Sequence, residues 1–188
     1  MIKDLVKTSR SYRRFFEKEA VTLETLRALV DITRFGPSAA NRQPLKYYLS
    51  CDAETNAAVF PHLAWAGYLK DWPGPSVGER PAAYIVILGD TTICSSFGCD
   101  HGIAAQNILL AAVEEGLGGC IFASIARKDL HSTLDLPDHC EILLVIALGK
   151  PKEKVVIDEM ERGGDHRYWR DENSVHHVPK RSLDEIII

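Results

Sequence analysis

Apolar and polar residues follow helical spacing in two segments of the N-terminal half. From Leu23 to Phe35, leucine, valine and isoleucine recur at near-helical intervals, and Thr22 stands where an N-cap is expected. Gly36-Pro37 ends this predicted helix, because neither residue readily continues one. A second helix is predicted from Asp52 to about Leu63, with Asp52 as its cap.

Dense apolar runs of strand length alternate with predicted helices. We expect strands at Lys46 to Cys51, Ala82 to Leu88, Cys120 to Ile125 and Ile142 to Leu148, and a short helix at Arg127 to Leu134. Neither an internal repeat nor a long linker interrupts the chain. Its 188 residues suffice for one domain with a sizeable core, so we expect a single domain over residues 1–188.

Asp100 to Leu117 is the strongest helix prediction, and its apolar residues cover most of the circumference. Gly116 and Gly118-Gly119 end it. A helix that is apolar nearly all round has to be buried, either inside a large core or against another subunit. In a chain of this length we expect the subunit interface.

Two long segments have no regular hydrophobic period. Trp65 to Arg80 is rich in glycine, proline and aromatic residues, which predicts an irregular loop of the kind that usually carries function. After Gly149-Lys150-Pro151 the chain becomes polar, yet it ends in the apolar run Ile186-Ile187-Ile188. We expect residues 150–188 to be an arm that packs on a partner subunit, with a disordered tail as the alternative.

Composition and charge narrow the classes of function. The chain is 46% hydrophobic with a formal charge of −4, so nothing favours binding to nucleic acid or to a membrane surface. No apolar run approaches the ~20 residues that span a bilayer, and no signal-peptide pattern follows Met1, so a cytoplasmic protein is expected. The five cysteines are scattered, which favours free thiols, and Cys94, Cys99 and His101 lack the second ligand cluster of a metal site.

The sequence lacks the phosphate-binding loops of P-loop and Rossmann proteins, a nucleophile elbow and a metalloprotease motif. It does contain a basic cluster beside a hydroxyl, formed by Arg10, Ser11, Arg13 and Arg14, just before the first long helix. Guanidinium groups bind phosphate through paired, charge-assisted hydrogen bonds, and the serine hydroxyl adds a donor. The cluster is therefore a candidate phosphate site, and a solvated surface is the alternative for the cluster by itself.

A second candidate element follows the first predicted helix. Two prolines in the segment Pro37 to Pro44 flank small residues and the side-chain amides of Asn41 and Gln43. Small residues let a planar ligand approach the backbone, and amides both donate and accept hydrogen bonds, as the pyrimidine edge of a flavin requires. An ordinary turn with a local asparagine cap is the alternative.

Taken in order along the chain, these segments resemble the nitroreductase family of FMN-dependent enzymes. The family pattern R-x-S-x-R is similar to Ser9 to Arg13, with a departure at Ser9, and P-S-x-x-N-x-Q-P is present from Pro37 to Pro44. Three further segments agree with the family: Ala105 to Gly118, Trp65 to Ile85, and Val178 to Leu183.

The resemblance implies an α+β fold with a mixed, mostly antiparallel sheet flanked by helices, in an intertwined homodimer that exchanges C-terminal arms. It also implies FMN-binding residues, with Arg13 as the candidate for the flavin N1–O2 edge and Ser9 as a departure whose missing charge Arg10 or the C-terminal basic pair has to supply. The implied set is Arg10, Ser11, Arg13, Pro37, Ser38, Ala39, Asn41, Phe122, Ala123, Ser124, Lys180 and Arg181.

The implied reaction is hydride transfer from NADH or NADPH through flavin N5 to a small oxidant, such as a nitroaromatic compound or a quinone. No side chain is required as a catalytic acid, and Trp65, Tyr68 and Trp72 are expected either to form a wall for the acceptor or to pack in the core. Two alternatives stay open. One is a specialised relative that destroys flavin or removes halogen from its substrate, and the other is a flavin-binding module without turnover.

Overall fold

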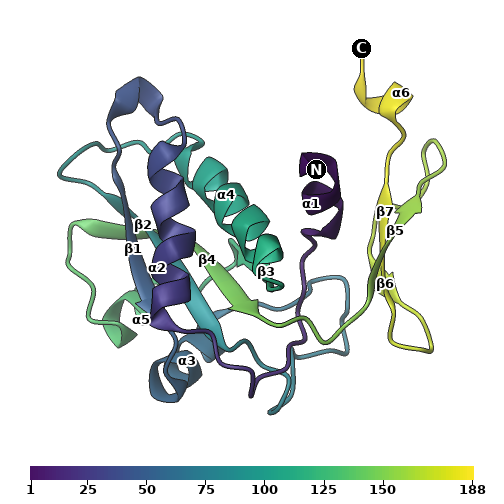
Figure 1. Cartoon of the computed structure of the whole chain (residues 1–188), viewed down its shortest axis with the longest axis horizontal. Helices are drawn as coiled ribbons and strands as arrows, with labels where there is room; N and C mark the ends of the chain where they lie inside the picture. Colours follow the sequence, from purple (N-terminus) through teal and green to yellow (C-terminus); the bar gives the residue numbers. More distant parts are fainter.

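The computed structural model describes residues 1–188, and a four-stranded antiparallel sheet lies at its centre (Figure 1). Its strands are β1 (Leu45–Ser50), β2 (Ala83–Asp90), β3 (Gly118–Phe122) and β4 (Cys140–Gly149), in the order β1-β2-β4-β3. All eight residues of β2 are buried, which explains why the sequence shows an unbroken apolar run there. All four predicted strands are therefore confirmed, although the third ends at Phe122 and not at Ile125.

Helices cover both faces of this sheet. On one face α2 (Leu23–Asp31) and α4 (Asp100–Glu114) pack against the β2 side chains Ile85 and Ile87. On the other face α3 (Ala53–Val59) and α5 (Arg127–Thr133) enclose a second core. The two cores follow from the alternation of side chains along a strand, because neighbouring residues of β2 point to opposite faces.

The predicted helices form with their predicted caps. Thr22 Oγ1 accepts a hydrogen bond from the Thr25 N–H at 3.1 Å, and Asp52 Oδ1 accepts one from the Thr55 N–H at 2.8 Å. Both helices tighten at their C-terminal ends into 3₁₀ turns, η1 (Ile32–Phe35) and η3 (Phe60–His62). The segment that follows η1 contains a further 3₁₀ turn, η2 (Ala39–Asn41).

Helix α4 is buried largely within its own chain. Its buried apolar residues are Ala104, Ala105, Ile108, Leu109, Ala111 and Ala112. The helix ends at Glu114, before Gly116 takes a left-handed conformation with φ of +70°. Most of the apolar surface of α4 is thus covered by the chain's own core. From the sequence alone, this surface is expected to lie at a subunit interface.

Two features of the N-terminal half complete the frame. A short helix, α1 (Ile2–Thr8), lies beside α4 and was not predicted, because its seven residues are fewer than the window over which a helical period is read (Figure 1). The segment from Trp65 to Arg80 contains neither helix nor strand, as its composition predicts. All five cysteines are free thiols, which confirms that prediction as well.

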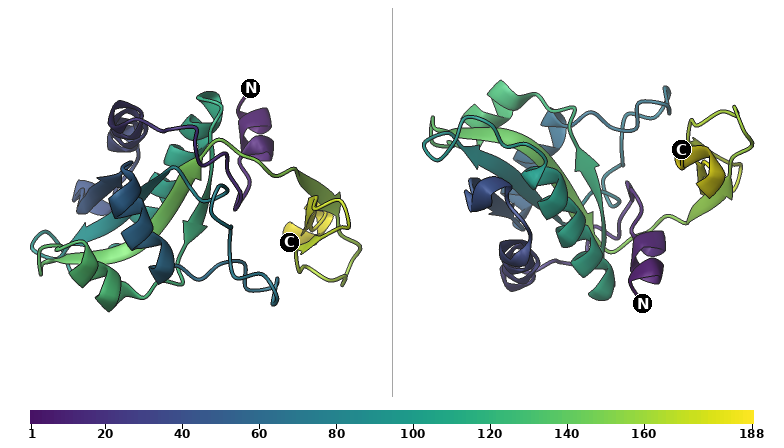
Figure 2. Two further views of the ribbon diagram at one scale, coloured as in Figure 1. Left: turned by 90° about the horizontal axis from the view of Figure 1, so that it is seen from below. Right: turned by 90° about the horizontal axis from the view of Figure 1, so that it is seen from above.

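The C-terminal segment has more regular structure than its polar sequence indicates. It forms a second sheet in the order β5-β7-β6, from β5 (Val155–Glu159), β6 (Trp169–Arg170) and β7 (His176–Lys180). A single turn of helix, α6 (Leu183–Ile186), follows. This small sheet stands to one side of the main sheet in every view (Figures 1 and 2). The fold is α+β and mostly antiparallel, with β5 and β7 as its one parallel strand pair. None of the helices is both long and apolar enough to cross a membrane.

Candidate functional site

A cavity of about 180 Å³ lies where the N-terminal segment, α4, β3 and the C-terminal sheet meet. It brings together four of the predicted phosphate-binding residues, Arg10, Ser11, Arg13 and Lys180, although Lys180 is far from the others in sequence. Arg181 is exposed and does not line it. The remaining lining residues are Ser9, Gln106, Leu109, Ile121, Tyr168, His176 and Val178. We call this space the Arg13 cavity.

Close backbone contact with β3 holds the N-terminal segment in place. The Tyr12 N–H donates to the Gly119 carbonyl at 3.0 Å, and Ser11 forms a parallel bridge with Gly119. A Cβ on the preceding residue, Gly118, would lie 2.5 Å from the Tyr12 ring and 2.7 Å from Pro151. Only glycine allows so close an approach, so Gly118 serves to place Tyr12 against β3.

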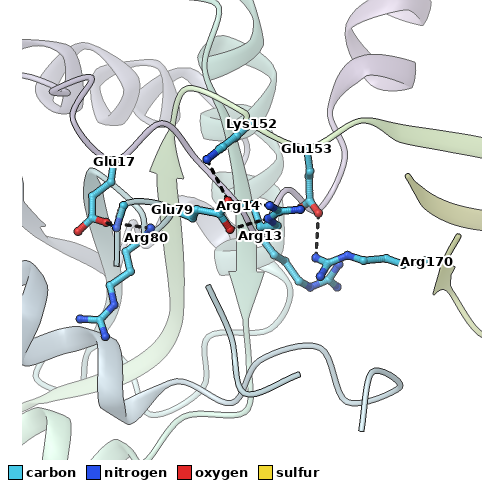
Figure 3. Close-up of polar contacts among 9 residues, drawn as sticks. Arg13, Arg14, Glu17, Glu79, Arg80, Lys152, Glu153 and Arg170 are labelled. Atoms are coloured by element: carbon cyan, nitrogen blue, oxygen red, sulfur yellow. Dashed lines mark hydrogen bonds and ion pairs between the residues drawn. The ribbon is translucent and has the colours of Figure 1, made fainter. Parts of the chain in front are cut away.

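Arg13 is buried at the wall of the cavity. Its Nη1 lies 3.1 Å from Nε2 of His176, and its Cζ lies 4.7 Å from the centre of the Tyr168 ring. Its backbone N–H donates to the carboxylate of Glu153, whose side chain is fully buried and whose Oε2 accepts from Arg170 Nη2 at 2.9 Å (Figure 3). Glu153 therefore links the N-terminal segment to the C-terminal sheet.

A second carboxylate fixes the end of the irregular loop. Arg14 donates to Glu79 through Nε and Nη2, both at 2.6 Å, and Lys152 Nζ lies 2.9 Å from Glu79 Oε1 (Figure 3). The hydrogen bonds from Arg14 and Lys152 lower the pKa of Glu79 to about 2, although its partial burial acts in the opposite direction. Glu17 adds a contact, since its Oε2 accepts from the Arg80 N–H at 3.2 Å.

The aromatic residues of this loop divide between the core and the surface. Trp65 packs edge-on against the buried Phe122 ring, with the centroids 4.6 Å apart, and is partly buried beside the second core. Tyr68 is half exposed and lies 5.0 Å from the Tyr168 ring of the C-terminal segment. The Arg170 guanidinium lies over the Trp72 ring, with its Cζ 4.2 Å from the ring centre. Trp65 therefore packs against the core, whereas Tyr68 and Trp72 join the loop to the C-terminal segment.

The end of β3 lies next to the start of the same loop. The carbonyl of Ser124 accepts a hydrogen bond from the Ala64 N–H at 3.1 Å. The side chains of Ala123 and Ser124 are exposed, and neither residue lines the Arg13 cavity. Phe122 is buried against Trp65 and does not line the cavity either.

The loop after α2 is held by a carboxylate that sequence reasoning missed. The Ser38 hydroxyl donates to Asp100 Oδ2 at 2.6 Å, and the Ala39 N–H donates to Asp100 Oδ1 at 3.1 Å. Ser38 Oγ also accepts from the Gln43 N–H at 2.9 Å. The hydroxyl is thus used inside the loop, and Asp100, 5% exposed in the first turn of α4, is the anchor.

This loop and the Arg13 cavity do not meet within one chain. Pro37 and Ser38 line a separate cavity, also of about 180 Å³, together with Asp100 and Gln43. Ala39 and Asn41 are exposed. The two sequence motifs that point to one cofactor therefore lie at two different places on the chain.

The Arg13 cavity has the chemistry of an anion site. Three of its lining side chains, Arg10, Arg13 and Lys180, are basic, and none is acidic. Two buried nitrogen atoms, Arg10 Nε and His176 Nδ1, have no hydrogen-bond partner. A buried donor without an acceptor is costly, so a ligand with oxygen acceptors would satisfy both. The residues present therefore fit the phosphate-bearing end of a cofactor such as FMN.

Several lining residues have no sequence signal of their own. Gln106 lies in the segment Ala105 to Gly118 that resembles the family, but as one of several polar residues of α4 it was not singled out. Tyr168 and His176 stand in a polar segment where composition indicates nothing beyond a surface arm. Neighbouring histidines are usually unremarkable, and only the packing of β7 singles out His176.

Comparison with known proteins gives one consistent result. The model of the family described as the nitroreductase family matches residues 6–85 and 97–150. A protein of Methanothermobacter thermautotrophicus, provisionally named an NADH dehydrogenase/NAD(P)H nitroreductase, is 27% identical over 157 residues, which cover 80% of this chain and 77% of that protein. The chloronitrobenzene nitroreductase of Comamonas testosteroni is 26% identical, in an alignment that covers 85% of this chain and 90% of that protein. The structure of an FMN-dependent nitroreductase from Clostridium difficile R20291 superposes with a TM-score of 0.66 at 24% identity, covering 82% of this chain and 89% of that one.

Proposed function

The chain belongs to the nitroreductase family of oxidoreductases, and from that premise we propose that it is an FMN-dependent enzyme that reduces a small oxidant with NADH or NADPH. The observation that carries the proposal is the Arg13 cavity, which three basic side chains and no carboxylate line, and two of whose lining residues each have an unsatisfied buried nitrogen atom. A phosphorylated cofactor matches that surface in charge and in hydrogen-bond acceptors.

In this proposal Arg10, Ser11 and Arg13 bind the phosphate and ribityl end of FMN. Lys180 supplies the C-terminal charge in preference to Arg181, because Lys180 lines the cavity and Arg181 does not. Ser9 also lines the cavity. Many family members have arginine at the position of Ser9, and in this chain the neighbouring Arg10 provides that charge.

The flavin ring would be enclosed by a second copy of the chain. The Arg13 cavity is smaller than the roughly 300–1,000 Å³ of ordinary small-molecule sites. Pro37, Ser38, Ala39 and Asn41 lie at a different place and would line the ring from the partner subunit. A homodimer with two shared sites, in which residues 150–188 pack on the partner, also gives the exposed Ile186-Ile187-Ile188 a place to be buried.

When bound, FMN supplies the chemistry, because flavin N5 accepts a hydride from a nicotinamide and passes it to an oxidant. The protein's part is binding and electrostatics. Arg13 places a permanent positive charge at the cavity. Ala123 and Ser124, exposed after β3, would border the reacting face together with Phe122 behind them. Nitroaromatic compounds and quinones are the proposed acceptors, in line with the named substrate of the Comamonas testosteroni relative.

Anaerobic flavin reduction tests the proposal. We expect the purified protein to bind FMN, to bleach at its visible absorption band when NADH or NADPH is added, and to recover colour with chloronitrobenzene or a quinone. A protein that binds no FMN on reconstitution overturns the proposal. Bound flavin that never bleaches indicates a binding module, loss of FMN itself in air indicates a flavin-destroying relative, and halide release from a halogenated substrate indicates a dehalogenase.

Sedimentation tests the dimer separately. We expect the full chain to sediment as a dimer, and a variant with Ile186, Ile187 and Ile188 replaced by serine to dissociate more readily, since these side chains are 64%, 63% and fully exposed in the single chain. A monomer at micromolar concentration that still binds FMN with full affinity would contradict the shared site.

A further inference from the structure

His176 is the first residue of β7, and its side chain reaches the Arg13 cavity. The residue is 1% exposed. Its backbone N–H donates to the Lys154 carbonyl at 2.9 Å, and the parallel pairing of β7 with β5 begins at this residue. The backbone therefore holds the ring in one place, at the junction of the C-terminal sheet and the cavity.

The contact with Arg13 determines which ring nitrogen carries the proton. Nε2 of His176 lies 3.1 Å from Nη1 of Arg13. A guanidinium group only donates hydrogen bonds, so Nε2 has to accept, and the ring is neutral with its proton on Nδ1. Burial is the main cause that lowers the pKa of His176 to about 4, and the charges of Arg13 and Arg170 lower it further. The ring is consequently uncharged at neutral pH.

The Nδ1–H has no acceptor within the chain. It is one of the two buried unpaired nitrogen atoms of the cavity lining, and the other belongs to Arg10. The Tyr168 ring lies against the histidine with the centroids 5.2 Å apart. An unsatisfied donor in such a place is costly, and an oxygen of a bound ligand would satisfy it.

We propose that His176 is a positioning residue of the cofactor site: its Nε2 holds the Arg13 guanidinium at the cavity, and its Nδ1–H donates to an oxygen at the phosphate-bearing end of the cofactor. The inference rests on the proposed binding of FMN. It makes the C-terminal sheet part of the site, because the same strand supplies both His176 and Lys180.

Three substitutions separate the two hydrogen bonds. His176→Phe removes both, His176→Gln keeps an acceptor near the position of Nε2, and His176→Asn keeps a donor near the position of Nδ1. His177→Phe is the matched control, because His177 pairs with Asp158 at 2.9 Å, stacks on Trp169 and does not line the cavity. The dissociation constants for FMN and for riboflavin, which lacks the phosphate, are measured for each variant by quenching of flavin fluorescence.

We expect His176→Phe to weaken FMN binding about 10- to 100-fold, as loss of one or two charge-assisted hydrogen bonds predicts, and to change riboflavin binding about threefold or less. The Gln and Asn variants should each recover part of the loss, and the control should bind as the wild type does. Unchanged FMN binding in His176→Phe overturns the inference, and so does an equal loss for FMN and riboflavin. A wild-type protein that binds no FMN contradicts the proposed function itself.

If His176→Phe does not fold, a measurement on the wild type tests the inference instead. In protein labelled with ¹⁵N-histidine, the His176 resonances should report a protonated Nδ1 and an unprotonated Nε2. Addition of FMN should shift the Nδ1–H resonance, and riboflavin should shift it less. A charged ring at pH 7, or an Nδ1–H that does not respond to FMN while flavin fluorescence shows binding, overturns the inference.

Discussion

The Ser38 hydroxyl donates to the Asp100 carboxylate across 2.6 Å, and this contact ties the loop after α2 to the first turn of α4. The loop needs such an anchor, because Ala40, Asn41 and Gln43 have φ values of 52°, 54° and 52°. Residues other than glycine rarely adopt this left-handed backbone conformation, and each such residue raises the free energy of the folded chain. The hydrogen bonds to Asp100 keep a strained loop in one shape.

Asp100→Asn should loosen this loop. The variant loses the charged acceptor for the Ser38 hydroxyl and the Ala39 N–H, so we expect a loss of about 1–3 kcal/mol in the free energy of unfolding. Amide hydrogen exchange over residues 39–43 should speed up, and FMN should bind more weakly if the loop lines the flavin. Asp31→Asn, at an exposed pair with Arg34, is the control, and equal exchange in both variants would contradict the role of Asp100.

Glu79→Gln should remove part of the acid sensitivity of the fold. The pKa of Glu79 is about 2 when folded and 4.5 ordinarily, so the unfolded chain takes up the proton first. The stability from the Arg14 and Lys152 contacts is therefore present above pH 4.5 and is lost as the pH falls towards 2.

Urea unfolding at pH 7 and pH 3 measures this effect. A shift of this size corresponds to about 3 kcal/mol at pH 7, with a smaller value expected because the three side chains are partly exposed. The wild type should lose more stability between the two pH values than Glu79→Gln does. Glu19→Gln, at an exposed pair with Lys150, should behave as the wild type, and equal pH dependence in all three proteins would refute the prediction.

Glu153→Gln should release the C-terminal sheet from the body of the chain. Removing one partner of a buried ion pair leaves the other charge uncompensated, at a cost of about 3–5 kcal/mol, and here the partner is Arg170. We expect faster hydrogen exchange and faster proteolysis within residues 155–180, with the main sheet still protected. Asp165→Asn, at the exposed pair with Arg167, should change neither, and protection of the small sheet in Glu153→Gln would show that other contacts hold it.

Gly118→Ala should displace the N-terminal segment from β3. The added methyl group would lie 2.5 Å from the Tyr12 ring, so we expect a loss of about 1–3 kcal/mol in stability and weaker FMN binding through movement of Ser11. Gly67→Ala adds a methyl group where no atom lies within 4 Å, and it should be nearly neutral. Thermal unfolding of the two variants side by side decides the matter.

Local patterns in the sequence were enough to predict the main framework. Thr22 and Asp52 cap helices because a side-chain oxygen satisfies a free N–H one turn ahead, whatever the rest of the chain does. The unbroken apolar run of β2 likewise predicts a strand covered on both faces. Arg10, Ser11, Arg13 and Lys180 were predicted as phosphate ligands from motifs, and the structure places them at one cavity.

Tertiary packing decided what surrounds those residues. Asp100, Glu153 and His176 stand in sequence contexts that are also typical of exposed residues, and each gains its role only by burial against a segment far away in the chain. Helix α1 has only seven residues, fewer than the window over which a helical period is read, and the small C-terminal sheet buries little apolar surface, so neither was predicted. The amino-acid sequence by itself determined the main helices, the four strands of the central sheet and the charged motif, because these depend on neighbouring residues. The partners of Arg13 depend on distant segments meeting, and only the folded chain specifies them.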